Sequence, residues 1–211
     1  GALVLLEGGV VGVIAAKVYD VEPFTLALIS AAPMFANLSS LLWSKLASGR
    51  RKVPSMTVIQ IVVMLCILAV AVSPINEMGA FILVSSMIFS RICVAGLTTL
   101  RSVVWSLNYA RHNRAKATSQ IQMINSLVTV AISSVIGPFL DAFPSSLGLL
   151  YGCGALLGIV GIGFFSKVKV QGEAEQLIAE KQRHVEGEKK LGFMEILRKD
   201  KRFARYQISK F

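Results

Sequence analysis

The chain has 211 residues, of which 54% are hydrophobic and only 16% are charged, and its mean hydropathy is +0.65. This composition is too apolar for a soluble domain, whose surface must carry charge. The formal net charge is +10, but the basic residues stand in short clusters between apolar runs and not on an aromatic-rich polar face. The composition therefore predicts a protein whose partner is a lipid bilayer, with no nucleic acid bound.

The charged residues divide the chain into two regions. Residues 1–166 contain ten Lys and Arg and five Asp and Glu, whereas residues 167–211 contain twelve and seven. We predict a transmembrane domain over residues 1–166 and a basic linker over residues 167–211. The sequence begins inside an apolar run without a Met, so we expect its first helix to be truncated.

Six apolar segments are long enough to cross a bilayer or nearly so. A hydrocarbon core ~30 Å thick needs roughly 20 apolar residues per helix. The short connections between the segments are marked by Pro, Gly, Asn and charge, so consecutive helices are predicted to be antiparallel. The predicted segments are 1–16, 24–44, 54–73, 79–100, 119–140 and 146–165.

The charges of the connections predict the orientation of the helices. The second and fourth connections are basic, as are the residues that follow the sixth segment, whereas the first, third and fifth connections carry Asp or Glu. Since Lys and Arg are retained on the cytoplasmic side, the first helix is predicted to run outward and residues 167–211 to be cytoplasmic. We expect a multi-pass protein of a plasma membrane or a bacterial inner membrane.

Two charged residues stand inside apolar segments. Glu7 precedes Lys17 by ten residues and Arg91 lies twelve residues into the fourth segment, which places them ~15 Å and ~18 Å below the outer surface. An unpaired Arg near the midplane costs at least ~2.5 kcal/mol, so such residues normally face a cavity or an opposite charge. We predict that Glu7 and Arg91 pair beside a cavity for a solute or coupling ion. The alternatives are a purely structural ion pair and a Glu7 exposed by truncation.

Small polar residues form stripes on the second and fifth segments. They recur at intervals of three or four residues, which places each stripe on one helix face. Such stripes line a watery path or bond to neighbouring helices. The longer polar groups are the candidates for the cavity wall: Asn37, Gln122 and Asn125.

Glycines at four-residue spacing predict close contacts between helices, because lipid provides no hydrophobic force to bring helices together. Each pair removes side chains from one face of a helix and lets another backbone approach. The pairs are Gly8 and Gly12, Gly148 and Gly152, and Gly154 and Gly158.

Motifs of enzymes and metal sites are not found in the sequence. His112 and His184 fall in predicted cytoplasmic segments, with no Ser, Cys or metal-ligand partner at membrane depth. Cys66, Cys93 and Cys153 lack metal-ligand spacing. We therefore expect no catalytic residue, no cofactor and no metal.

Three short motifs occur in a matching order along the segments. They are Gly49-Arg50-Arg51-Lys52 after the second segment, Arg91 in the fourth, and Gly137-Pro138 in the fifth. With the number and sidedness of the helices, they resemble the major facilitator superfamily, whose members have two six-helix halves joined by a cytoplasmic loop. The chain departs from the family pattern in five places. Leu42 and Leu46 replace the Gly and Asp of the loop motif, and Gly96 follows Arg91 at five residues and not four. In the fifth-helix motif Ser133 replaces a Gly, and no Gly pair follows Pro138.

The resemblance implies an all-α membrane protein with six transmembrane helices in two inverted three-helix repeats. It implies that the chain is the amino-terminal half and that the linker leads to a missing carboxy-terminal six-helix half. Gly49, Arg50 and Arg51 would then form a cytoplasmic gate loop, and Gly137 and Pro138 the fifth-helix motif. The implied function is secondary active transport of a small solute by alternating access, either proton-coupled through Glu7 or by facilitated diffusion. The alternative is a non-transporting structural or assembly subunit of a membrane complex.

Overall fold

The structure is a computed structural model that describes residues 2–143 and 146–185. Residue 1 of the first predicted segment, residue 144 of the fifth connection and the linker after residue 185 lie outside the described residues. The described residues form helices and no strand. Two compact units divide the chain, Gly1–Glu173 and Ala174–Phe211, and each is treated by itself.

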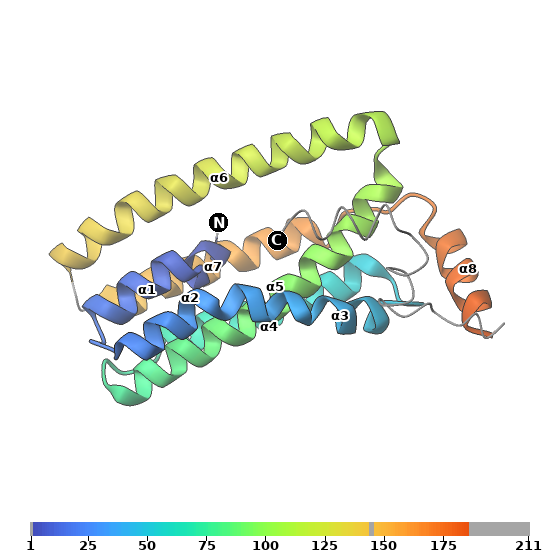
Figure 1. Cartoon of the computed structure of the whole chain (residues 1–211). Helices are drawn as coiled ribbons and strands as arrows, with labels where there is room; N and C mark the ends of the chain where they lie inside the picture. Colours follow the sequence, from blue (N-terminus) through green and yellow to red (C-terminus); the bar gives the residue numbers. More distant parts are fainter. Residues whose placement is uncertain (1, 144–145, 186–211) are drawn as a thin grey trace, which may run out of the picture. The chain divides into compact units, whose positions relative to one another are not determined.

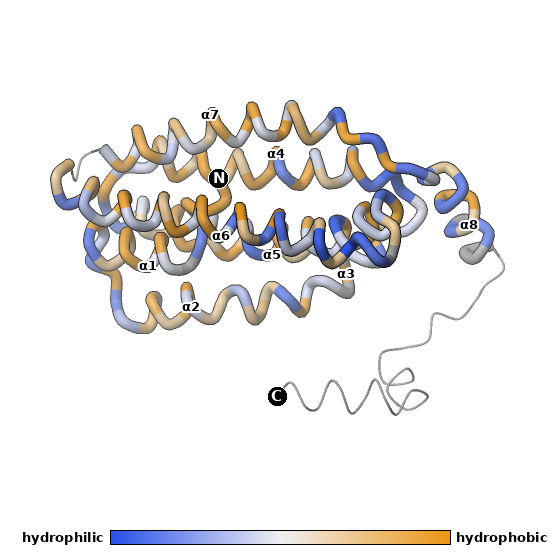
Figure 2. The backbone as a smooth tube through the Cα atoms, turned by 90° about the horizontal axis from the view of Figure 1, so that it is seen from above, coloured by the Kyte–Doolittle hydropathy of each residue, from blue (hydrophilic) through white to orange (hydrophobic). Residues whose placement is uncertain are grey.

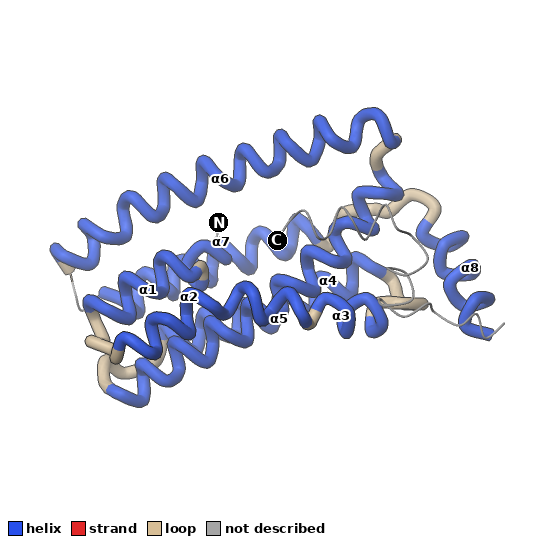
Figure 3. The backbone as a smooth tube through the Cα atoms, in the orientation of Figure 1, coloured by secondary structure: helices blue, strands red, loops and turns tan. Residues whose placement is uncertain are grey.

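Each predicted segment is helical in the first unit (Figures 1 and 3). Among the described residues, four helices, α4 to α7, are long and apolar enough to cross a membrane, and α2 is a shorter apolar helix. The count of six spans stays a prediction. The elements are η1 (Ala2–Leu6), α1 (Gly8–Lys17), α2 (Pro23–Leu38), α3 (Ser40–Leu46), α4 (Lys52–Ala71), α5 (Glu77–Asn108), α6 (Arg111–Ala142), α7 (Leu147–Phe165) and α8 (Glu173–Val185).

Two of the predicted segments are interrupted. The first changes at Glu7 from the 3-10 helix η1 to α1, and Gly8 and Gly9 follow, whose low helix propensity favours a break there. The second is divided at Ser39, where both the backbone N–H and the hydroxyl donate to the Ala36 carbonyl, at 2.9 Å and 2.6 Å. A side chain that bonds locally competes with the regular helical pattern.

Two helices are longer than their apolar segments. α5 continues beyond Leu100 to Asn108 and α6 begins at Arg111, so only two residues connect the helices that contain the predicted segments 79–100 and 119–140. The Arg114 side chain donates to the Ser106 carbonyl at 2.9 Å and braces this turn. With 32 residues each, both helices are ~48 Å long and extend well beyond a ~30 Å hydrocarbon core.

Helix α4 packs against α5 and α7, while α2 packs against α5 and α1, so α4 and α5 form the centre of the first unit (Figure 1). Their contacts are made by side chains with no exposed surface, including Val63 and Ile67 of α4 and Leu83 and Met87 of α5. The buried Tyr151 hydroxyl of α7 donates to the Leu5 carbonyl at 2.9 Å and joins η1 to α7, which packs against α4. In contrast, most of α6 is exposed.

The connections gather at opposite ends of the first unit. At one end the Lys17 ammonium contacts the Asp141 carboxylate at 2.6 Å, and the Tyr19 and Ser73 hydroxyls are 3.4 Å apart. At the other end the Asn108 amide donates to the Lys169 carbonyl at 3.1 Å. Apolar colours predominate along α7, whereas α8 is largely hydrophilic (Figure 2). The polar contacts between connections therefore lie beyond the apolar part of the helices.

Three glycines of the predicted pairs lie in close contact with another element. A Cβ at Gly148 would lie 2.7 Å from the Ala71 carbonyl oxygen, and one at Gly154 or Gly158 would overlap a side chain of η1 or α4. At Gly12 and Gly152 nothing lies within 4 Å, so the predicted contact is wrong there.

Candidate functional site

Glu7 lies at the junction of η1 and α1, where its backbone is extended, with φ −82° and ψ 139°. The Glu7 N–H donates to the Val4 carbonyl and its carbonyl accepts from the Val11 N–H, both at 2.9 Å. These two backbone hydrogen bonds hold the chain on both sides of the break. The Glu7 side chain takes part in neither of them and is half-buried. Interrupted helices are where many transporters place solute or ion sites.

Arg91 lies on α5 and is half-buried among apolar helices. Its Nε atom is buried and makes no hydrogen bond in the part of the chain that the structure describes. No ion pair within 4.0 Å joins the described side chains of Arg91 and Glu7. The ion pair expected from the sequence is therefore not formed between these described side chains, and the role of Glu7 and Arg91 stays a prediction.

The polar candidates for the cavity wall lie on two other helices. Asn37 is exposed near the end of α2, and Gln122 and Asn125 are exposed on α6. None of these three described side chains bonds to Glu7 or Arg91. Ser30, a small polar residue of the predicted stripe on the second segment, donates to the Leu26 carbonyl of its own helix at 3.0 Å. The placement of these three amides in a cavity wall stays a prediction.

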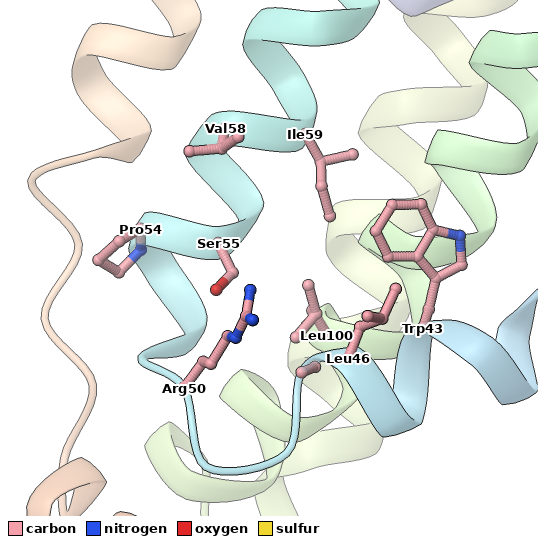
Figure 4. Close-up of a pocket in the computed structure, with 9 residues that line it drawn as sticks. Trp43, Leu46, Arg50, Pro54, Ser55, Val58, Ile59 and Leu100 are labelled. Atoms are coloured by element: carbon pink, nitrogen blue, oxygen red, sulfur yellow. The ribbon is translucent and has the colours of Figure 1, made fainter.

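The gate-loop residues form the turn between α3 and α4. Gly49 has a φ of +71°, a left-handed conformation that glycine adopts without steric cost. Arg50 and Arg51 are exposed. Beside this turn lies a cavity of about 310 Å³, the turn cavity, which Figure 4 shows. Residues of α3, the turn, α4 and α5 line it, among them Trp43, Leu46, Arg50, Ser55, Val58, Ile59 and Leu100.

Gly137 and Pro138 lie inside α6, which continues through them to Ala142. Pro138 has no N–H and cannot donate to the carbonyl one turn before it, a position that often bends a helix. A Cβ at Gly137 would have no neighbour within 4 Å. The motif therefore stands on the exposed helix and makes no close helix contact in the first unit.

Three polar contacts were not predicted from the sequence. Asn108 makes two hydrogen bonds to the segment that follows α7. Its amide N–H donates to the Lys169 carbonyl at 3.1 Å, and its amide oxygen accepts from the Gln171 N–H at 2.9 Å. The Glu173 carboxylate accepts from the Lys52 N–H at 2.8 Å and caps the start of α4. The Arg101 guanidinium lies 5.7 Å from the centre of the Trp105 ring. Only this last pair has a local signal, its spacing of four residues on one helix.

No group of three or more His, Cys, Asp or Glu side chains that could hold a metal ion occurs in the described part of the chain. No curated protein and no solved structure matched the chain. The family model of the Major Facilitator Superfamily matches residues 3–208. The all-helical fold and the four helices long enough to cross a bilayer agree with this match. The chain therefore belongs to the Major Facilitator Superfamily, whose members are integral, multi-pass membrane transporters and not enzymes.

Proposed function

We propose that this chain is one half of a secondary active transporter that moves a small solute by alternating access. The observation that carries the proposal is the presence of Glu7 and Arg91 within apolar segments, both half-buried and without an ion pair between the two described side chains. A guanidinium at membrane depth costs ~2.5–3.5 kcal/mol, and a closed pair would offset that cost better than the separated arrangement does. A separated pair is therefore better suited to a changing contact than to a fixed structural clamp.

Proton coupling follows from the same two groups. Protonation of Glu7 would remove its attraction for Arg91. A conformation that brings the two side chains together would then become less stable relative to one that separates them. Glu7 lies at the break between η1 and α1, where a small rotation of α1 would change its distance from Arg91. Proton symport or antiport is the proposed mode, and facilitated diffusion would result if Glu7 never changes its protonation.

The exposed surfaces of α2 and α6 support a role for a second six-helix half. Both helices expose large apolar side chains, such as Phe35 and Leu38 on α2 and Leu127 and Val130 on α6. The same helices carry exposed amides, which lipid would not solvate. A second half that rocks against these helices would cover the apolar groups and enclose Asn37, Gln122 and Asn125 in an aqueous cavity.

The proposed orientation places the basic ends of the helices in the cytoplasm. Gly49, Arg50 and Arg51 then form the inner gate loop, and residues 167–211 continue on the cytoplasmic side. We place the protein in a plasma membrane or a bacterial inner membrane on the same grounds.

Reconstitution tests the proposed function. Proteoliposomes would contain either the 211-residue chain alone or this chain together with a carboxy-terminal six-helix half, and a metabolite mixture would be screened for uptake. We expect uptake only with both halves, because one half provides only one wall of the cavity. Uptake by the chain alone, with crosslinking showing no homodimer, would contradict the two-half mechanism. No uptake of any solute by the two-half protein would contradict the transport function itself.

A further inference from the structure

The turn cavity combines a basic rim with an apolar wall. Arg50 lines it and is exposed, and no described acidic side chain bonds to the Arg50 guanidinium. Figure 4 shows the guanidinium directed over the opening toward Ser55, with Trp43 and Ile59 on the far side. The Ser55 hydroxyl already donates to the Arg51 carbonyl at 2.8 Å. Recognition of an anion at this rim therefore depends on Arg50.

The far wall of the cavity is fixed in place by helix α5. The Trp43 indole N–H donates to the Ile92 carbonyl at 2.8 Å, so the ring has no unsatisfied donor on its cavity side. A Cβ at Gly96 would lie 2.6 Å from the ring, so the absence of a side chain there makes room for the indole. Trp43 thus offers a rigid apolar face to whatever enters the cavity.

The surroundings carry a strong positive charge. No Asp or Glu occurs between Glu22 and Glu77 in the sequence, whereas Lys45, Arg50 and Arg51 lie in that interval and are exposed. Glu173 is near the turn, but its carboxylate accepts from the Lys52 backbone N–H. The ligand that complements this turn is therefore an anion.

The apolar wall indicates that the anion carries a hydrocarbon chain. Leu46 is 55% exposed and Val58 is 61% exposed, and both line the cavity beside the basic rim. The volume of about 310 Å³ is at the lower end of the ~300–1,000 Å³ typical of ligand pockets. It would hold a phosphate group and the first part of an acyl chain, with the rest of the chain continuing along α4 in the bilayer.

We propose that the turn cavity is a binding site for an anionic phospholipid of the adjacent leaflet, with its phosphate on Arg50 and one acyl chain between Val58 and Trp43. An arginine near a bilayer surface attracts anionic lipid by electrostatics, and the cavity adds a defined place for the chain. The site lies at the end of α4 and does not involve Glu7 or Arg91, so it does not depend on proton coupling.

Fluorescence quenching of Trp43 by brominated lipids tests the site. The sequence contains two tryptophans, and Trp105→Phe leaves Trp43 as the only one while keeping an aromatic ring beside Arg101. The full chain would be reconstituted in dioleoylphosphatidylcholine vesicles that contain an equal mole fraction of dibrominated phosphatidylglycerol or dibrominated phosphatidylcholine. From the quenching of Trp43 we expect phosphatidylglycerol to bind beside this residue about fivefold more strongly than phosphatidylcholine. This factor is equivalent to about 1 kcal/mol, the contribution of one basic residue at an anionic surface.

Three variants distinguish a defined lipid site at Arg50 from a general attraction of anionic lipid to the basic surface. Arg50→Gln should abolish the preference, and Arg50→Lys should keep most of it, because the positive charge remains. Lys116→Gln removes an exposed cation outside the cavity and should leave the preference unchanged. Equal quenching by both lipids in the Trp105→Phe protein, or the same loss of preference in Lys116→Gln as in Arg50→Gln, would overturn the proposal.

Discussion

At the scale of single residues, the Tyr151 hydroxyl is a polar group that joins η1 to α7. It is fully buried and donates to the Leu5 carbonyl at 2.9 Å. Tyr151→Phe leaves that carbonyl without its donor, so we expect a loss of about 1–3 kcal/mol in the free energy of unfolding. Equilibrium unfolding in mixed micelles would measure this loss. The control is Tyr109→Phe, which changes an exposed tyrosine. An equal effect of both variants would contradict the role of this hydrogen bond.

Some residue-scale features could be predicted from the sequence and others could not. The position of Arg91 well inside α5 could be predicted by counting residues from the start of its apolar segment, because helical rise converts sequence distance into depth. The contact of Trp43 with α5 could not be predicted, since it depends on the packing of segments 49 residues apart. The Glu173 cap of α4 has no local signal either, because its two partners are 121 residues apart in the sequence.

At the scale of elements, the glycines of α7 decide how closely that helix approaches α4. A Cβ at Gly148 would lie 2.7 Å from the Ala71 carbonyl oxygen, a backbone atom that cannot rotate away. We expect Gly148→Ala to destabilise the protein by about 1–3 kcal/mol through overpacking. Thermal unfolding in detergent would show this loss.

Gly152→Ala is the matched control on the same helix, because a Cβ at this position would have no neighbour within 4 Å. Alanine has a higher helix propensity than glycine by ~1 kcal/mol, so this variant should be neutral or more stable. Destabilisation of both variants to the same degree would show that close approach is not the reason for glycine at 148.

The sequence predicted the positions of the helices better than their ends. Hydropathy locates the part of a helix that lies in lipid, so the predicted segments 79–100 and 119–140 are contained within α5 and α6. It does not detect polar helical turns outside the membrane, which is why both helices extend toward the connection at Tyr109. The break at Ser39 depends on a local hydrogen bond that hydropathy also does not report.

At the scale of the whole molecule, the orientation in the membrane can be tested by cysteine labelling. Glu77 and His112 are exposed and lie at the two ends of the first unit. We expect an impermeant thiol reagent applied from outside to label Glu77→Cys and not His112→Cys, because basic ends are retained in the cytoplasm. Cys66, Cys93 and Cys153 would first be replaced by Ser. Labelling of His112→Cys alone would show that the proposed orientation is inverted.

The central claim is that Glu7 couples proton binding to solute movement through its interaction with Arg91. Two effects of Glu7→Gln must be separated, because removal of the carboxylate charge leaves the half-buried Arg91 guanidinium less compensated and can lower activity without any coupling role. Solute exchange across the membrane, which needs the conformational change but no proton gradient, reports whether the variant still works. Glu22→Gln, which changes an exposed carboxylate at the start of α2, is the matched control.

The most direct measurement is accumulation of a solute from the uptake screen in proteoliposomes of the two-half protein under an imposed pH gradient. We predict that the wild type and Glu22→Gln accumulate the solute against its gradient, whereas Glu7→Gln exchanges solute but does not accumulate it. If Glu7→Gln still accumulates the solute in response to the pH gradient, Glu7 does not couple protons to transport.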